Sequence, residues 1–112
     1  VTSLNAELAR TNIANYSAAK GGLKMLTKSM ATEWGRFGLN VNAVGPGYIE
    51  TELTKCLVED ETFNSWVDGE VPLGRWGKPE DIVGTVIFLA SPASDYVDGF
   101  TVYVDGGWQA SL

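Results

Sequence analysis

The sequence predicts an α/β fold built on a parallel sheet, and two observations support this prediction. Short apolar, β-prone segments alternate along the chain with longer segments whose apolar residues recur every three or four positions. Glycine and proline separate these segments. Helices that alternate with apolar strands favour parallel strands joined by right-handed crossovers. We therefore expect the order strand, helix, strand, helix, strand in a single partial domain covering residues 1–112.

The first part of the chain is expected to supply a strand end, a loop, a long helix and a second strand. Val1–Ser3 is interpreted as the end of a strand, and a loop follows to about Asn12. Residues 14–37 have the apolar spacing of a one-sided helix, and glycines near its end are expected to stop it. Residues 39–44 alternate and are β-prone, so they are expected to form the second strand.

A long irregular region follows this strand. Gly45-Pro46-Gly47 is a breaker, and residues 48–77 are expected to contain short helices at about 51–58 and 61–67. This region is longer than most connections between elements, and connections of this length often act as lids or binding loops. We therefore expect a lid or a binding loop at about residues 48–77.

The last part of the chain is expected to supply a helix and a strand. Pro79, followed by two acidic residues, is a typical first turn, and the helix is expected to run to about Ala90. A loop at 91–99 precedes the last strand, which lies within residues 100–107. Three parallel strands with these helices make one half of a doubly wound nucleotide-binding fold.

Composition excludes several classes of function. The net charge of -6 argues against a nucleic-acid binder, and there is no apolar run of the roughly 18 residues that a membrane span needs. Cys56 is the single cysteine, which indicates a reducing, cytoplasmic setting without an internal disulfide. The chain has no histidine, so a Ser-His-Asp triad and most zinc sites are excluded, and we predict no metal site.

Tyr16 and Lys20 are the first candidates for chemistry. Side chains four positions apart share a helix face, and a neighbouring ammonium favours the ionised form of a phenol. The pair could also be an ordinary surface pair on an amphipathic helix. Ser3 precedes Tyr16 by thirteen positions at the end of the first strand, where ligands of parallel sheets bind, although a serine in a turn explains it as well.

The segment after the second strand offers a further candidate site. Glycine in Gly45-Pro46-Gly47 permits close approach of the backbone to a ligand. Thr51 could cap the following helix and offer its hydroxyl to a phosphate or an amide. A strand-to-helix turn with a capping threonine explains the same composition almost as well.

These motifs together resemble the short-chain dehydrogenases/reductases. The resemblance rests on Ser3, the Tyr16-x-x-x-Lys20 spacing, Asn42-x-x-x-Pro46-Gly47 after a strand, and the ending "PLGRWGKPEDIVGTVIFLASPASDYVDGFTVYVDGGW" at 72–108. It covers nearly the whole chain and is closest to the family members that act on sugar acids. It implies the C-terminal half of a Rossmann-type sheet and NAD or NADP as the cofactor.

The resemblance also implies a role for each site residue. Tyr16 would exchange a proton with the substrate oxygen, Lys20 would activate Tyr16 and hold the nicotinamide ribose, and Ser3 would orient the substrate oxygen. The residues implied to contact the nicotinamide and pyrophosphate region are Pro46, Gly47, Ile49 and Thr51.

Several features of the family are absent from these 112 residues. They include the glycine-rich phosphate loop, the residue that selects NAD or NADP, and the catalytic asparagine. The chain starts without methionine and in mid-strand, so we expect a fragment or processed product with little or no dehydrogenase activity by itself.

Three functions remain open at this point. The first is a sugar-acid or polyol oxidoreductase, although acidic residues of the lid would disfavour an anionic substrate if they faced the pocket. The second is a 3-oxoacyl carrier-protein reductase, for which Arg75 and Lys78 form a small basic patch. The third is a non-catalytic oligomerisation fragment, because the resembled family forms dimers and tetramers through the long helix and the last helix and strand. We expect a small-molecule alcohol or ketone substrate and a homo-oligomer.

Overall fold

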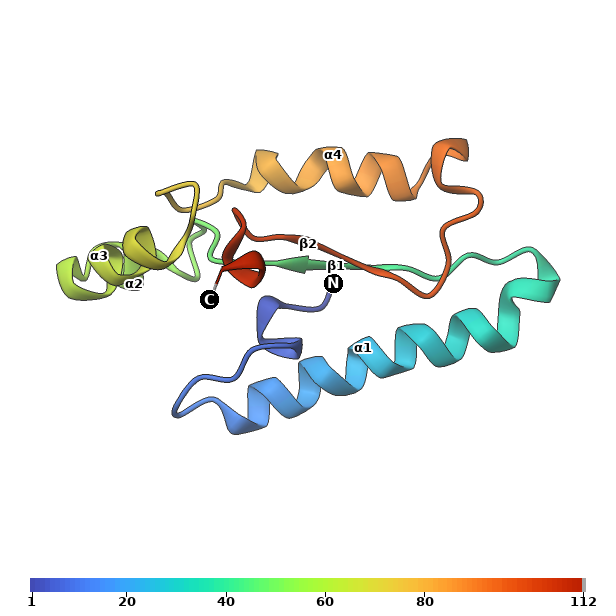
Figure 1. Cartoon of the computed structure of the whole chain (residues 1–112), viewed down its shortest axis with the longest axis horizontal. Coiled ribbons are helices and arrows are strands. Elements are labelled where there is room, and N and C mark those ends of the chain that lie inside the picture. The colour runs from blue at the N-terminus through green and yellow to red at the C-terminus, as the bar shows by residue number, and fades with distance from the viewer. Residues whose placement is uncertain (112) are drawn as a thin grey trace.

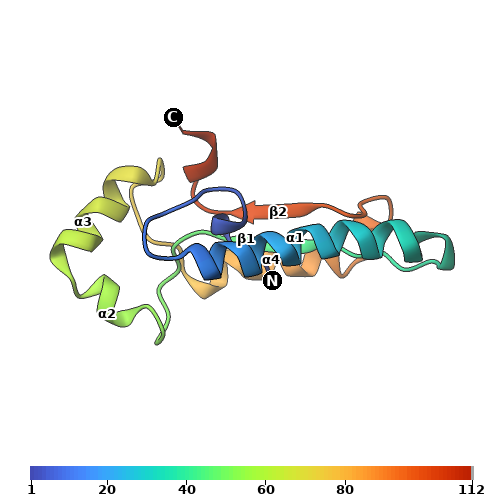
Figure 2. The same ribbon diagram turned by 90° about the horizontal axis from the view of Figure 1, so that it is seen from below.

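The computed structural model describes residues 1–111 and consists of two helical layers with a small sheet between them. Helix α1 (Ala14–Trp34) lies along one face of the sheet and α4 (Pro79–Leu89) along the other, as Figures 1 and 2 show from two directions. The sheet of the described residues contains β1 (Ala43–Pro46) and β2 (Thr101–Val104), paired in parallel. The prediction of an α/β fold with a parallel sheet is confirmed.

The first expected strand, Val1–Ser3, is not a strand of this sheet. The N–H of Thr2 donates to the carbonyl of Val44 at 2.7 Å, and the hydroxyl of Thr2 reaches the same oxygen at 3.2 Å. The segment is therefore extended and lies beside β1, but one backbone hydrogen bond does not make a ladder. It passes directly into the short 3₁₀ helix η1 (Leu4–Ala6), whose N-cap is Ser3.

The long helix ends close to where the sequence predicts. α1 continues into the 3₁₀ turn η2 (Gly35–Phe37), and Gly38 closes it with φ of 77°, a left-handed conformation that suits glycine. The second strand differs from the prediction of 39–44, because β1 begins at Ala43. In the preceding residues, Asn42 donates its side-chain amide to the carbonyl of Val97 at 2.7 Å, so side-chain bonds stand there beside single backbone bonds such as that from the N–H of Gly99 to the carbonyl of Val41 at 2.9 Å.

The region after β1 lies beyond the carboxyl ends of the strands (Figure 1). It contains α2 (Lys55–Val58) and α3 (Glu61–Glu70), so the first of the two expected helices begins later and the second ends later than predicted. Asp60 caps α3 by accepting hydrogen bonds from the N–H groups of Thr62 and Phe63 at 3.0 Å. Gly45 and Pro46, expected to break the chain, belong to β1.

The core of this end of the molecule is apolar and aromatic. Val67, Val71 and Trp76 are buried, and partly buried side chains pack against them. Tyr48 lies in the middle, with its ring centroid 5.5 Å from that of Trp76 and 5.0 Å from that of Trp108. Trp108 begins the last turn, η4 (Trp108–Ala110), so this cluster joins the region after β1 to the end of the chain. Within residues 1–111, no helix combines the length and apolar character that crossing a membrane requires.

Candidate active site

A cleft of about 260 Å³ opens beside the start of α1 and the segment that follows β1. In an open parallel sheet, ligands bind outside the carboxyl ends of the strands, and β1 ends at this cleft. The cleft therefore lies where this fold class binds its ligands. Its lining residues are Ser3, Leu4, Asn5, Arg10, Ile13, Tyr16, Gly47, Tyr48, Ile49 and Thr54.

Two of the predicted site residues that line this cleft carry hydroxyl groups. Ser3 is buried, and its Oγ accepts a hydrogen bond from the N–H of Asn5 at 3.2 Å. A hydroxyl that accepts in this way still has its proton to donate. Tyr16 lies in the first turn of α1 with 44% of its surface exposed, so a ligand can reach it. The structure thus brings Ser3 and Tyr16 together although they come from different elements.

Lys20 lies one helical turn after Tyr16, as the spacing predicts. Its Nζ atom is 5.7 Å from the centroid of the Tyr16 ring, within the range of a cation–π contact, and it donates to the carbonyl of Val1 at 3.2 Å. Lys20 does not belong to the lining of the cleft. Its ammonium therefore lies beside the Tyr16 ring and outside the lining of the cleft.

The chain directly after β1 is packed so closely that only glycine fits at position 47. The N–H of Gly47 donates to the carbonyl of Val104 at 2.9 Å, and a β-carbon at Gly47 would come within 2.8 Å of the Cα atom of Asp105. Gly47 and Ile49 both line the cleft, whereas Pro46, the last residue of β1, does not. Close packing of the strand ends therefore gives the cleft a wall of bare backbone.

Thr51 is not placed as the sequence suggested. It does not cap α2, because that helix begins at Lys55 and residues 51–54 form a turn instead. The N–H of Thr51 donates to Oγ1 of Thr54 at 2.9 Å, and this hydroxyl donates to the carbonyl of Ile49 at 2.7 Å. Thr54 lines the cleft, whereas Thr51 lies in a separate, open hollow with Glu50 and Glu52.

Sequence reasoning missed Arg10 and Tyr48, which also line the cleft. The guanidinium of Arg10 donates to the hydroxyl of Tyr48 at 3.2 Å and lies 5.3 Å from the centroid of the Phe63 ring. Burial raises the pKa of the Tyr48 phenol, and the Arg10 charge offsets part of that rise. Arg10 is in an irregular loop, where no spacing rule applies, so a single sequence holds no signal for it.

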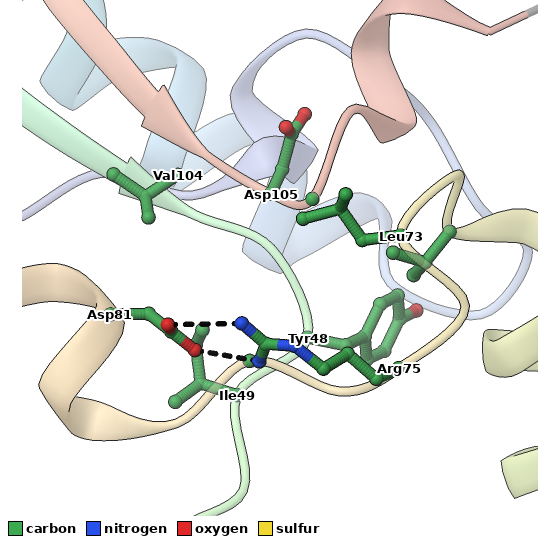
Figure 3. A pocket seen from close by; sticks show the side chains of 10 residues that line it. Tyr48, Ile49, Leu73, Arg75, Asp81, Val104 and Asp105 are labelled. Atoms are coloured by element: carbon green, nitrogen blue, oxygen red, sulfur yellow. Dashed lines mark hydrogen bonds and ion pairs between the residues drawn. The ribbon is translucent and has the colours of Figure 1, made fainter.

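A second pocket of about 170 Å³ shares Tyr48 and Ile49 with the cleft (Figure 3). Arg75 and Asp81 point toward one another there, joined by hydrogen bonds of 2.8 and 3.1 Å. The guanidinium also donates to the carbonyl of Trp76 at 2.8 Å. Because of the Arg75 bond, and secondarily the N–H of Lys78, the pKa of the Asp81 carboxyl falls to about 2. Both charges are thus matched within the chain.

Comparisons with known proteins agree with this geometry. A family model described as enoyl-(acyl carrier protein) reductase matches residues 1–109. The gluconate 5-dehydrogenase of Gluconobacter oxydans is 51% identical over 112 residues, which are 100% of this chain and 44% of that protein. The 2-dehydro-3-deoxy-D-gluconate 5-dehydrogenase of Bacillus subtilis is 52% identical over 93 residues, 83% of this chain and 37% of that protein.

A solved structure is also closely similar. The crystal structure of a gluconate 5-dehydrogenase from Burkholderia cenocepacia, in complex with NADP and tartrate, superposes with a TM-score of 0.97 at 48% identity. The match covers 99% of this chain and 44% of that one. The chain therefore spans less than half the length of the relatives it matches.

Proposed function

Because the chain belongs to the short-chain dehydrogenase/reductase family, we propose that it forms the proton-transfer site of an NAD(P)-dependent oxidoreductase that interconverts a secondary alcohol and a ketone. The proposed substrates are sugar acids or polyols, since gluconate and its derivatives occur in the names of the relatives. The observation that carries this proposal is that Ser3 and Tyr16 line the same cleft beside the end of β1.

In this mechanism the phenol of Tyr16 is the general acid and base. During oxidation its ionised oxygen accepts the proton of the substrate hydroxyl, and during reduction the phenol returns that proton to the carbonyl oxygen. The hydroxyl of Ser3 donates a hydrogen bond to the same substrate oxygen and holds it in place. Lys20, whose Nζ atom lies 5.7 Å from the centroid of the Tyr16 ring, is proposed to assist this transfer with its positive charge. A bound nicotinamide would accept or supply the hydride.

The cleft fits the reactive end of such a cofactor. Its volume of about 260 Å³ lies just below the ~300–1,000 Å³ of pockets that enclose a drug-sized ligand. The cleft therefore suits a nicotinamide ring together with a small substrate. Ile49 offers an apolar wall and Gly47 bare backbone. We propose that Tyr16 and Lys20 hold the ribose hydroxyls and that the nicotinamide and pyrophosphate region is contacted by Pro46, Gly47, Ile49 and Thr51.

Thr51 can take part only if the cofactor extends beyond the cleft along residues 49–51. The choice between NAD and NADP stays open in this proposal. We propose residues 48–77 as the substrate lid, because α2 and α3 lie beyond the strand ends on which the cleft is built (Figure 2).

A role in assembly is favoured by one further observation. α4 exposes large apolar side chains on its outer surface, among them Val83, Val86 and Ile87. Exposed apolar patches of this kind mark interaction surfaces. We propose that the complete protein is a homo-oligomer that uses this face. The carrier-protein alternative has less support, because Asp81 neutralises Arg75 in the basic patch that it requires.

Tyr16→Phe in the complete protein that carries these residues tests the proposed chemistry. Loss of a general acid and base costs ~10²–10⁴-fold, so kcat for D-gluconate oxidation should fall by that amount while NADP affinity, measured by calorimetry, falls far less because Lys20 still holds the ribose. Tyr96→Phe is the matched control, because Tyr96 is fully exposed outside the cleft. Turnover near the wild-type rate in Tyr16→Phe would show that another group moves the proton.

A second test measures cofactor binding and turnover by residues 1–112 as an isolated chain. They contain no G-x-G-x-x-G phosphate loop, so we expect weak NAD and NADP binding by calorimetry and little or no turnover. Tight binding with turnover would show that the described half suffices.

A further inference from the structure

The cleft that contains Ser3 and Tyr16 has a single charged residue in its lining, as far as residues 1–111 describe it, and this residue is Arg10. The other lining residues are neutral. The chain as a whole carries a net charge of -6, so the charge in this lining is opposite in sign to that of the chain. A cleft lined by one sign of charge attracts ligands of the opposite sign.

Arg10 is held in place and still has donors to offer. It gives one hydrogen bond to the Tyr48 hydroxyl, and its guanidinium lies over the ring of Phe63. A guanidinium has five N–H donors, so most of them stay available to a ligand. Within the part of the chain that the structure describes, no carboxylate lies at ion-pair distance from Arg10.

Other cations near the strand ends are engaged within the chain. Lys24 forms an ion pair with Glu7, and Arg75 forms one with Asp81. Lys20 donates to the carbonyl of Val1. Arg10 therefore differs from Lys24 and Arg75 in having neutral partners only, the Tyr48 hydroxyl and the Phe63 ring, and it differs from Lys20 in belonging to the lining of the cleft.

Two of the acidic residues after β1 do not oppose an anion in this cleft, whereas Glu70 shares a neighbouring hollow with Arg10. Glu50 and Glu52 line the separate hollow around Thr51, and neither belongs to the lining that contains Arg10. The expectation that an acidic lid disfavours anionic substrates therefore does not apply to these two side chains.

We propose that Arg10 binds a carboxylate of the substrate and so makes the cleft selective for sugar acids over neutral polyols. The planar fork of a guanidinium matches the two oxygens of a carboxylate, and a sugar acid would then be held at two points. Its carboxylate would bind Arg10, and its reacting oxygen would bind Ser3 and Tyr16. This inference rests on the proposed function, because it names the substrate class of that same site.

The first experiment compares two substrates of the complete protein, D-gluconate and the neutral polyol D-sorbitol. Loss of a charge-assisted hydrogen bond should make Arg10→Gln lower kcat/KM for D-gluconate about 10–100-fold, mainly through KM, and leave kcat/KM for D-sorbitol unchanged. Arg10→Lys keeps the charge without the fork, so its value should lie between those of wild type and Arg10→Gln. Arg36→Gln is the matched control, because Arg36 stacks on Phe37 away from the cleft.

The second experiment needs no turnover and no variant. Phenylglyoxal modifies arginine side chains, and mass spectrometry reads the modification at each position of the wild-type protein. We expect D-gluconate to protect Arg10 and D-sorbitol not to protect it. Arg36 should be modified equally in both solutions and serves as the internal reference.

The outcomes separate this inference from the proposed function. Unchanged kcat/KM for D-gluconate in Arg10→Gln, or absence of protection by D-gluconate, overturns the role of Arg10 and leaves the dehydrogenase intact. Protection of Arg10 in a protein that oxidises neither substrate with NAD or NADP supports the carboxylate site and overturns the proposed function. If Arg10→Gln does not fold, the protection of wild-type Arg10 decides the question.

Discussion

Gly47 and Asp105 lie so close together that a β-carbon on Gly47 would stand 2.8 Å from the Cα atom of Asp105 and 2.9 Å from its Cβ atom. These two residues directly follow β1 and β2, so the contact sets how closely the ends of the two strands approach. The carboxylate of Asp105 in turn accepts hydrogen bonds from the N–H groups of Gly107 at 3.0 Å and Gln109 at 2.9 Å. One glycine thus links the wall of the cleft to the last turn of the chain.

Gly47→Ala should destabilise the protein. The added methyl group meets backbone atoms, which cannot move aside as a flexible side chain can, so we expect a loss of ~1–3 kcal/mol in the free energy of unfolding. Gly69→Ala is the control, because nothing lies within 4 Å of its β-carbon in α3 and alanine is favoured over glycine in helices by ~1 kcal/mol. Urea denaturation measures both, and equal stability of the two variants would contradict the close contact.

Tyr48→Phe should weaken the binding of a carboxylate substrate without changing the chemical step. It removes the hydroxyl that accepts from Arg10 but keeps a ring in the aromatic cluster. Because one hydrogen bond contributes ~0.5–1.5 kcal/mol, KM for D-gluconate should rise about 2–10-fold with kcat unchanged. Steady-state kinetics with Tyr96→Phe as the control checks this, and an unchanged KM would limit Tyr48 to a packing role.

Asn64→Ala should destabilise the packing around α3. The indole N–H of the buried Trp76 donates to Oδ1 of Asn64 at 2.8 Å, so the substitution leaves a buried donor without its partner. We expect a loss of ~1–3 kcal/mol in the free energy of unfolding, measured by urea denaturation. Ser65→Ala, at an exposed neighbouring position of the helix, is the control. A smaller loss in a Trp76→Phe background is expected as well, and equal losses in both backgrounds would show that the hydrogen bond contributes nothing.

Asp81→Asn should change the dependence of stability on pH. The pKa of Asp81 is about 2 in the folded chain and 3.8 as an unperturbed group, so its ion pair stabilises the fold above about pH 4 and this contribution is lost as the pH falls toward 2. Thermal unfolding between pH 5 and pH 2 should therefore be less steep in Asp81→Asn than in wild type, since an asparagine does not titrate. Glu80→Gln, next to it on α4, should retain the wild-type slope, and identical slopes in all three proteins would contradict the pKa shift.

The long elements could be predicted from the sequence because their patterns are periodic. α1 and α4 lie where apolar spacing and the proline at position 79 indicate, and the parallel sheet follows from their alternation with β-prone segments. The strand boundaries could not be predicted, because long-range bonds decide them. Asn40, for example, donates hydrogen bonds from its side-chain amide to the carbonyls of Asp95 and Val97 at 3.0 Å, and no local sequence pattern predicts such partners.

The site was predicted in part for the same reasons. Ser3 and Tyr16 are indicated by their spacing, Gly47 and Ile49 by the resemblance to the family, and all four line one cleft in the structure. Arg10 reaches that cleft from an irregular loop through its contacts with the aromatic side chains of the region after β1, which are tertiary and invisible to spacing. Thr54 lines the cleft in place of Thr51 for a similar reason, because the carbonyl of Ile49 accepts a hydrogen bond from the hydroxyl of Thr54.

The pairing of Ala43 with Thr101 has a consequence for the order in which the chain folds. The connection between these residues contains α2, α3 and α4, so the entropy of closing a long loop opposes the first ladder bond between β1 and β2. Helices depend on contacts between near neighbours in the sequence and form without that cost. We therefore expect the helices to be present before the strands meet, which makes the wall of the cleft one of the last parts of this chain to assemble.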